Sequence, residues 1–525
     1  MKWLFLLLIS TTTSAQEFDL VILNGKIIDG TGNSWYYGDI GIRDGKIAAI
    51  GQLGTANTLK SISAKGMVVT PGFIDVHAHI ESSIFQKPSA DNFIFDGVTT
   101  VVTGNCGSSF QSGIGEFLRK VDSTGTAINI ATLVGHNTIR EEVMQRAQRD
   151  PNESEQQLME ALVTKAMAEG ATGMSTGLIY IPGTYAKTRE IIGLARIVKA
   201  NQGIYASHMR NEGNEIDAAI KETIEIGRAT GIPVEISHFK LSGQRNWGGS
   251  NRTLGLIMAA RKEGLDVTID QYPYTASSTN LHVLLPSWVL AGGTDSMNYR
   301  LTNSAVFNSI RQEMLTKAKT DKRKNYAYAV VANCPGDSSL NGKSISDITK
   351  TNGRKPNIKN DIETVKQIIL KGGAQMIYHS MNEEDVRNIM RYPFNMIASD
   401  AGVVYLPKSV PHPRAYGTNA RVLAQYVRET NTISLEEAIR RMSSLPAQKF
   451  KFQSKGLLKP GMDADIVIFD PLTVRDNSTF DLPHQFSSGF RYVIVNGELT
   501  LENNTLTGAR AGKALYGLAI PGKIP

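Results

Sequence analysis

The central part of the chain alternates short apolar segments with longer amphipathic ones, and this alternation constrains the fold more than any other feature. Amphipathic stretches such as 153–168, 215–229 and 254–263 have apolar residues at helical spacing. Between such stretches lie eight segments with the composition of buried strands, at 73–76, 99–103, 127–134, 173–178, 204–207, 234–237, 265–269 and 395–399. Eight strand–helix repeats predict an α/β fold, a TIM-like (β/α)8 barrel. A doubly wound open sheet is the alternative, but no glycine-rich phosphate loop opens its first helix.

Metal-binding residue types stand where five of these predicted strands end. Because the carboxyl ends of barrel strands meet at one face, we expect these side chains to lie close together. A thiolate and imidazoles are the ligands that zinc prefers. The sequence therefore predicts a metal site there, with a carboxylate beside it, formed by His77 and His79, Cys106, His208, His238 and Asp400.

Each of these residues also has an ordinary structural interpretation. His208 or His238 alone is typical of a hydrogen-bonded structural histidine, and Asp400 alone of a helix cap. Cys106 alone is typical of a small buried side chain, or of a disulfide with Cys334, since these are the only two cysteines. Their joint placement at strand ends favours the metal site, and with it two free thiols.

The two ends of the chain differ from its centre. Residues 1–15 combine a charged start, an apolar run and a small-residue cleavage site near Ala15, which predicts a signal peptide and export to a periplasm-like compartment. Residues 16–70 and 451–525 are rich in short strand candidates, and we expect them to form one small β-sandwich domain. The barrel would then span 71–450, with a polar insertion around 286–363 that forms a lid or a surface decoration.

Charge and hydropathy exclude two classes of partner. The formal charge is +7 and the pI about 9.1, but lysines and arginines are spread along the chain. Their densest cluster, 317–324, is short and lacks interleaved aromatic residues, so we expect no nucleic-acid site. No segment after the signal peptide has the 18 or more apolar residues of a membrane span. The residue order predicts no particular oligomeric state.

Five motifs together resemble the amidohydrolase superfamily, and within it the N-acyl-D-amino-acid deacylase (D-aminoacylase) family. The resemblance covers nearly all of the chain after the signal peptide. The glycine-flanked Cys106 is the most specific signal, because many relatives bridge their metals with a lysine on strand four, where this chain has none. The motifs are Pro-Gly-Phe-Ile-Asp-Val-His-Ala-His at 71–79, Gly-Asn-Cys-Gly at 104–107, Ser-His-Met-Arg at 207–210, Ile-Ser-His-Phe-Lys at 236–240 and Ser-Asp at 399–400.

The resemblance implies a role for each candidate residue. Cys106, His208 and His238 would hold one tightly bound zinc, and His77 and His79 would form a second, weaker site with Cys106. Asp400 would act as the general acid and base. The substrate carboxylate would be bound by Tyr180, Lys240 and Arg414. For His136 and His282 the sequence leaves a substrate contact and a structural role equally open.

The function implied is zinc-dependent hydrolysis of the amide bond of N-acyl-D-amino acids. A dipeptidase for dipeptides with a C-terminal D-amino acid is the first alternative, because a peptide bond is also an acyl amide. A cyclic-amide hydrolase is disfavoured by the missing strand-four lysine. A non-catalytic zinc-binding protein is disfavoured by Asp400, because a closed metal site needs no base beside it.

Overall fold

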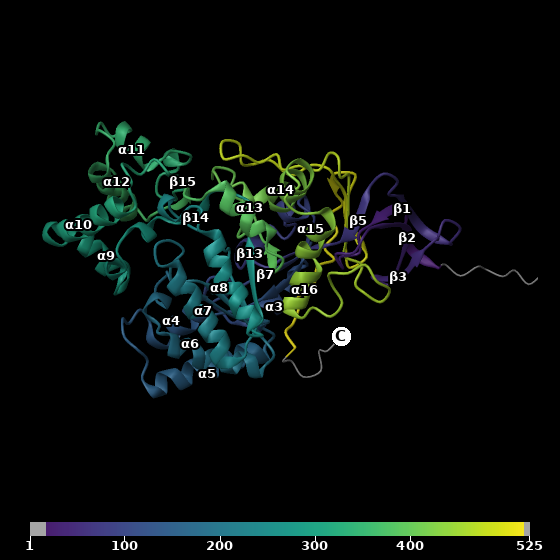
Figure 1. Ribbon diagram of the computed structural model, residues 1–525, viewed down its shortest axis with the longest axis horizontal. Helices are drawn as coiled ribbons and strands as arrows, with labels where there is room; N and C mark the ends of the chain where they lie inside the picture. The colour runs from purple at the N-terminus through teal and green to yellow at the C-terminus, as the bar shows by residue number, and fades with distance from the viewer. Residues whose placement is uncertain (1–16, 519–525) are drawn as a thin grey trace, which may run out of the picture.

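The structure is a computed structural model that describes residues 17–518. The predicted signal peptide lies outside the described residues. Figure 1 shows three parts in a row: a helical unit at the left, a central barrel, and a β-sheet domain at the right. Among the described residues, no helix is both long enough and apolar enough to cross a membrane.

The central part is the predicted (β/α)8 barrel of parallel strands. Strand order follows the chain, and β8 and β9 together supply the third position, because β8 pairs with β7 and β9 with β10. The strands are β6 (Phe73–Asp75), β7 (Val98–Thr103), β8 (Asn129–Thr132), β9 (Val134–Gly135), β10 (Gly173–Gly177), β11 (Ile204–His208), β12 (Val234–Ile236), β13 (Val267–Gln271) and β17 (Asn395–Ile397).

The first and last strands meet just beyond their ends, and this contact closes the barrel. The Asp400 amide donates to the His77 carbonyl at 2.8 Å, and the His79 amide donates to the Ala401 carbonyl at 2.9 Å. The buried Asp75 carboxylate accepts the Ser399 amide at 3.1 Å. Residues 323 positions apart are thereby fixed side by side, among them two histidines and an aspartate of the predicted site.

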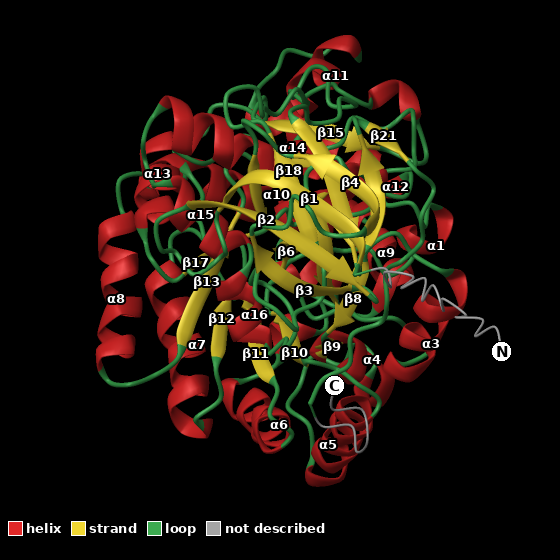
Figure 2. Ribbon diagram, turned by 90° about the vertical axis from the view of Figure 1, so that its right-hand side faces the viewer, coloured by secondary structure: helices red, strands yellow, loops and turns green. Residues whose placement is uncertain are grey.

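Amphipathic helices surround the strands (Figure 2). In α7, for example, Ile216, Ala219, Ile220 and Thr223 recur at helical spacing and are buried against the barrel. The outer helices and shorter ones near them are α1 (Ser83–Gln86), α2 (Asp91–Ile94), α3 (Ile114–Thr124), α4 (His136–Met144), α5 (Glu153–Ala168), α6 (Thr188–Ala200), α7 (Ile216–Thr230), α8 (Ser250–Lys262), α13 (Glu383–Arg391), α14 (Arg414–Arg421), α15 (Leu435–Met442) and α16 (Ser444–Phe450).

Strands from both ends of the described chain form one continuous sheet. Its halves join at β5, which pairs in parallel with β1 and antiparallel with β18. Isoleucines from both halves, including Ile22, Ile40 and Ile466, share one buried core. The strands are β1 (Phe18–Ile27), β2 (Tyr36–Arg43), β3 (Lys46–Gly51), β4 (Thr58–Ser63), β5 (Val68–Pro71), β18 (Ile466–Phe469), β19 (Phe490–Val495), β20 (Glu498–Glu502) and β21 (Thr505–Leu506).

The unit inserted between β13 and β17 is larger than the expected 286–363. Its antiparallel sheet places β16 between β14 and β15, so it starts near 277 and ends near 378. The sequence hid this start because β14 reads Ser-Ser-Thr-Asn and has no apolar residue. The unit has its own buried core. Its elements are β14 (Ser277–Asn280), α9 (Gly293–Thr302), α10 (Ser304–Thr320), β15 (Ala329–Asn333), α11 (Ile345–Thr351), α12 (Ile358–Leu370) and β16 (Gln375–Tyr378).

Candidate metal centre and active site

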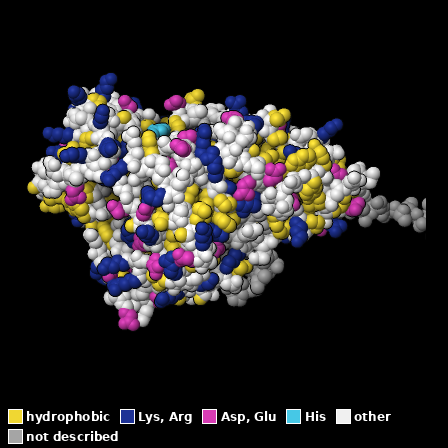
Figure 3. Space-filling view, viewed as in Figure 1, with side chains coloured by type: hydrophobic (Ala, Val, Ile, Leu, Met, Phe, Trp, Pro, Cys, Tyr) yellow, Lys and Arg dark blue, Asp and Glu magenta, His cyan; other side chains and the backbone are white. Residues whose placement is uncertain are grey.

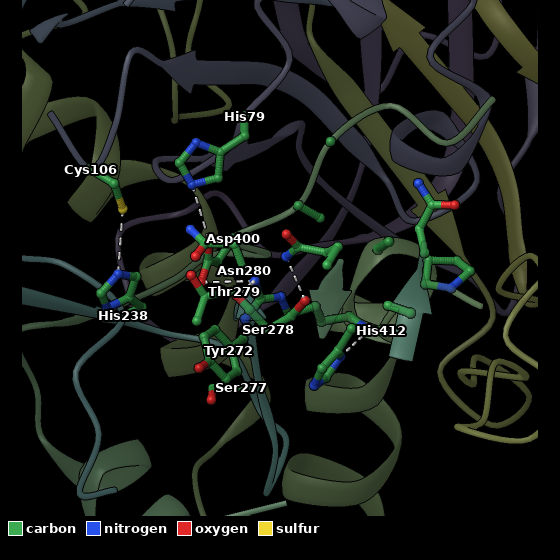
Figure 4. Close-up of a pocket in the computed structure, with 18 of the residues that line it drawn as sticks. His79, Cys106, His238, Tyr272, Ser277, Ser278, Thr279, Asn280, Asp400 and His412 are labelled. Carbon is green, nitrogen blue, oxygen red and sulfur yellow. Dashed lines mark hydrogen bonds and ion pairs between the residues drawn. The ribbon is translucent and has the colours of Figure 1, made fainter. Parts of the chain in front are cut away.

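A cavity of about 670 Å³ lies at the carboxyl ends of the barrel strands, beneath the inserted unit. Figure 4 shows side chains from distant parts of the chain converging there. The lining includes eight of the nine residues that the sequence singled out, namely His79, Cys106, Tyr180, His208, His238, Lys240, Asp400 and Arg414. His77 lies fully buried behind them.

Cys106, His208 and His238 form a compact set of donor atoms. Cys106 Sγ lies 3.4 Å from His208 Nδ1 and 3.5 Å from His238 Nε2. These separations match the edge of roughly 3.5 Å expected between sulfur and nitrogen ligands in tetrahedral zinc coordination. His208 Nδ1 and His238 Nε2 are 2.7 Å apart, slightly closer than such coordination needs, so these two rings would separate a little around an ion. The donor set fits zinc.

His77 and His79 complete a second group next to the first. His77 Nε2 lies 3.4 Å from Cys106 Sγ and 3.7 Å from Asp400 Oδ1. His79 Nε2 lies 3.2 Å from the same Asp400 oxygen. Cys106 thus lies within 3.5 Å of one histidine of the first pair and of both histidines of the second.

Two buried carboxylates hold these histidines from behind. Asp270 Oδ2 lies 3.2 Å from His77 Nδ1, and Glu212 Oε1 lies 2.9 Å from His238 Nδ1. Each carboxylate lies against Nδ1, and Lys240 Nζ also lies 2.9 Å from His238 Nδ1, so in both rings Nε2 is the nitrogen directed at Cys106. Carboxylate–histidine pairs of this kind orient metal ligands. They are the observation in this structure that argues most directly for a metal.

Sequence reasoning missed both carboxylates. The expected strand seven ended at 269, one residue before Asp270. The observed strand β13 ends at Gln271, and this end would have placed Asp270 among the polar residues at the strand ends. Glu212 lies in the loop after β11, four residues beyond His208, where no periodic pattern marks it.

Glycines explain why the loop around Cys106 has its particular sequence. A Cβ on Gly104 would lie 2.1 Å from the Leu133 carbonyl oxygen, and one on Gly107 would lie 2.1 Å from Asn137 Oδ1. Cys106 itself adopts a positive φ of 53°. His238 and Asp400 also have positive φ, at 38° and 51°. Left-handed backbone is costly for such residues and is concentrated at functional sites.

Charges across the site hold its acidic groups ionised. Burial alone raises the pKa of the Cys106 thiol, but the charges of the neighbouring histidines outweigh burial and hold that pKa well below its usual range. Burial likewise raises the pKa of Asp400, yet the Arg414 charge and the His79 hydrogen bond hold it well below its usual range. A thiolate and a carboxylate are the forms that metal binding and proton acceptance require.

The three candidate carboxylate-binding residues lie in the same cavity but have different partners. Arg414 Nη2 lies 2.9 Å from Asp400 Oδ2, and the guanidinium lies over the Tyr272 ring at 4.4 Å. Lys240 Nζ is 2.5 Å from Glu212 Oε1, so a buried carboxylate already balances its charge. The Tyr180 hydroxyl is 2.9 Å from Thr279 Oγ1 in β14. Of these side chains, Arg414 is the one paired with Asp400.

His412 determines where Arg414 sits. Its Nε2 donates to the Ala276 carbonyl at 2.9 Å, and its Nδ1 accepts the Arg414 backbone amide at 3.0 Å. This pair of contacts requires the neutral imidazole. Burial and the Arg414 charge accordingly hold the pKa of His412 well below its usual range.

The structure also decides the residues that the sequence left open. His136 is buried against Glu190, with 2.8 Å between Nε2 and Oε1, and does not line the cavity, so its role is structural. His282 lines a second, adjoining cavity. Cys106 and Cys334 are both buried and unpaired, so the disulfide alternative is wrong.

Comparison with known proteins identifies the family. The model for the amidohydrolase family matches residues 60–501, and one for the N-terminal domain of the urease alpha-subunit matches residues 8–74. The D-aminoacylase of Alcaligenes xylosoxydans xylosoxydans is 36% identical over 96% of this chain and 98% of its own. The N-acyl-D-glutamate deacylase of the same organism is 35% identical over 92% and 93%.

A solved structure shows the same architecture. N-acyl-D-glutamate deacylase from Bordetella bronchiseptica, complexed with zinc and a phosphonate inhibitor that mimics the tetrahedral intermediate, superimposes with a TM-score of 0.82 at 34% identity. The superposition covers 95% of this chain and 99% of that one. The chain therefore belongs to the amidohydrolase family, beside D-aminoacylase and N-acyl-D-glutamate deacylase.

Proposed function

We propose that this protein is a zinc-dependent hydrolase that cleaves the amide bond of N-acyl-D-amino acids to a D-amino acid and a carboxylate. The observation that carries the proposal is the meeting of three groups in one cavity. A Cys106–His208–His238 donor set lies against Asp400, and Arg414 lies 2.9 Å from that aspartate. The set supplies a metal position, a base and a cation for a free carboxylate within one small volume.

Zinc bound by Cys106, His208 and His238 would polarise the scissile carbonyl and make water acidic enough to attack near neutral pH. Asp400 would take the proton of that water at Oδ1 and then deliver it to the leaving amine nitrogen. Asp270 and Glu212 keep the Nε2 lone pairs of His77 and His238 directed at the site. The inserted unit contributes part of the cavity wall, including Thr279, Asn280 and Asn333.

Recognition of an amino acid fits the cationic side of the cavity. Arg414 can grip a carboxylate with two parallel hydrogen bonds. Arg414 Nη1 is buried with no partner within the described part of the chain, so a hydrogen-bond donor is left for substrate. Preference for the D-series is supported by the two relatives, which are named for D-configured substrates.

Two alternatives are weaker. A cyclic-amide substrate would leave Arg414 without a carboxylate, and β10 offers no lysine to bridge two metals. A non-catalytic zinc protein would have no use for an ionised Asp400 beside the donor set. A dipeptide with a C-terminal D-amino acid remains a substrate of the same chemical type, because its amide and carboxylate have the same spacing.

A hydrolysis panel tests the proposal. Purified zinc-loaded protein is given N-acetyl-D-amino acids, their L-enantiomers, and dipeptides with a C-terminal D-residue, and amine release is measured. We expect turnover of the D-series and none above the Asp400→Asn background for the L-series. Cleavage of the L-series alone would contradict the proposal, and so would an inactive protein that carries zinc.

We also propose that the protein is exported, because residues 1–15 have the charge and apolar pattern of a signal peptide. Expression of the full chain followed by fractionation and N-terminal sequencing of the mature protein tests this. We expect an N-terminus near Gln16 outside the cytoplasm. An intact Met1 in the cytoplasmic fraction would overturn it.

A further inference from the structure

A second cavity, of about 870 Å³, opens beside the first and is not used by the proposed chemistry. The two cavities share part of their walls, formed by Ile179, Tyr180, Glu212, Ser277, Thr279 and Asn280. The first cavity alone falls within the range of roughly 300–1,000 Å³ that small-molecule sites occupy. The second is therefore space beyond what a small acylated amino acid needs.

The second cavity lies on the side away from Arg414 and Lys240, and Tyr180 stands in the wall that it shares with the first cavity. Neither Arg414 nor Lys240 lines it. A substrate whose carboxylate is at Arg414 and whose carbonyl is at the metal position has its acyl group on the remaining side. That side leads past Tyr180 and Thr279 into the second cavity.

The inserted unit and the barrel form its opposite walls. The inserted unit supplies both apolar side chains, among them Leu284, Leu285, Met297 and Met314, and polar or charged ones, whereas the barrel loops offer Asn211, Asn214 and Asn246. Asn214 Nδ2 donates to Asp321 Oδ1 at 3.1 Å and links the two walls at the rim. A lining that combines an apolar patch with polar side chains suits an extended acyl chain that carries polar groups.

The cationic side chains that line this cavity differ in their partners: Arg146 and Arg210 are paired with Glu141 and Glu222, outside the lining. Arg245, Lys317 and Arg323 line it, and within the described part of the chain none of them forms an ion pair. Arg323 lies 3.4 Å above the Tyr328 ring. Desolvation lowers the pKa of Lys317; the charge of Asp321 opposes this shift, and the charge of Arg323 adds a smaller lowering. Figure 3 shows lysines and arginines gathered over the inserted unit.

We propose that the second cavity binds the distal part of the substrate's acyl group and selects an acyl group with a negative charge, as in a dicarboxylic or acidic peptidyl acyl chain. The inference rests on the proposed amide hydrolysis and specifies its substrate class. Lys317 and Arg323 would attract the distal carboxylate, and the apolar wall would hold the chain between it and the scissile bond.

The test compares matched acyl groups on one D-amino acid. Succinyl is paired with butyryl, and adipoyl with hexanoyl, so that each pair differs by the distal carboxylate, and N-acetyl serves as the baseline. We expect kcat/KM to favour the charged member of at least one pair by about fivefold, the effect of one partly solvated ion pair. The preference should weaken in high salt. Equal values within both pairs would overturn the inference.

Two double variants that remove the same number of charges show whether the acyl-group preference arises in the second cavity. In the double variant Lys317→Gln and Arg323→Gln, the ratio of kcat/KM for the charged acyl group to kcat/KM for the neutral one should fall to about one. The control, Lys319→Gln with Lys322→Gln, removes the same charge from exposed positions that do not line the cavity, and its ratio should match that of the wild type. An equal fall in both double variants would overturn the inference.

Two further outcomes distinguish binding of the acyl group in the second cavity from binding of the amino-acid side chain there and from failure of the proposed function. If the cavity instead held the amino-acid side chain, the Lys317 and Arg323 variant would change the ratio between N-acetyl-D-glutamate and N-acetyl-D-glutamine, which would overturn it. If no N-acyl-D-amino acid were hydrolysed, the proposed function itself would fail. Hydrolysis of N-acetyl substrates without any charge preference would contradict only the inference made here.

Discussion

Arg414 Nη2 lies 2.9 Å from Oδ2 of Asp400, so the cation proposed to bind the substrate carboxylate is paired with the proposed base. The pairing has a chemical consequence. A substrate carboxylate that draws the guanidinium toward itself weakens the hold on Asp400 and makes that group a better proton acceptor. Carboxylate binding and base strength are therefore linked through one side chain.

Replacing Arg414 by lysine tests this link. Lysine keeps the charge but loses the planar pair of donors, so kcat/KM for an N-acetyl-D-amino acid should fall about 10- to 100-fold. The corresponding amino acid amide has no carboxylate, and the variant and the wild type should cleave it at similar low rates. A variant that loses the same factor on both substrates would show that Arg414 acts only through the fold.

Asp400→Asn should abolish turnover but not metal binding. The change removes proton transfer, which contributes about 10²- to 10⁴-fold to rate, while Cys106, His208 and His238 are untouched. Steady-state kinetics and elemental zinc analysis measure the two effects separately. Asp91→Asn is the matched control, because Asp91 pairs with Lys87 at 2.7 Å and does not line the cavity. Substantial activity in Asp400→Asn would refute the assigned role.

Gly107→Ala should disrupt the metal centre through sterics. The new Cβ would lie 2.1 Å from Asn137 Oδ1 and 2.6 Å from the Gly177 amide, so the Cys106 loop must shift. Gly231→Ala is the control, because Gly231 also has a positive φ, of 68°, but open space around it. The control should cost only the left-handed backbone penalty of about 1–2 kcal/mol and keep its zinc. Equal zinc content in both variants would contradict this account of the loop.

His412 should make stability fall in mild acid. Its pKa is depressed in the folded state, so below its unfolded pKa of about 6.5 the unfolded chain binds a proton that the folded chain excludes. Stability is therefore lost as pH falls, by up to about 1.4 kcal/mol per pH unit. Urea unfolding at several pH values measures the slope, and His412→Asn should reduce it.

Two substitutions at position 412 separate the role of His412 in positioning Arg414 from its effect on the pH dependence of stability. Asparagine keeps an acceptor for the Arg414 amide two residues on, whereas alanine does not. We expect His412→Ala to raise KM with a smaller effect on kcat, and His412→Asn to restore KM while keeping the flatter pH dependence of stability. Loss of kcat with unchanged KM in His412→Ala would refute the positioning role.

The site residues that could be predicted from the sequence are those at the ends of the barrel strands. His77, Cys106, His208 and Asp400 could be found because each follows an apolar run, and a barrel brings such positions to one face. Asp270 was missed only because the expected strand ended at 269, two residues before the observed end. Glu212 and His412 could not be found this way, because they act from loops whose paths depend on packing.

Local periodicity and the order of strands along the chain were enough to predict the barrel and the residue types of the metal centre. Which atoms face one another depends on how distant loops pack. Nothing in the residue order places Glu212 behind His238 or Arg414 against Asp400, and the polar strand β14 gave no sign that a second cavity opens beneath the inserted unit. Local pattern reports burial and secondary structure, whereas charge pairing across a cavity is a property of contacts between loops that are far apart in the chain.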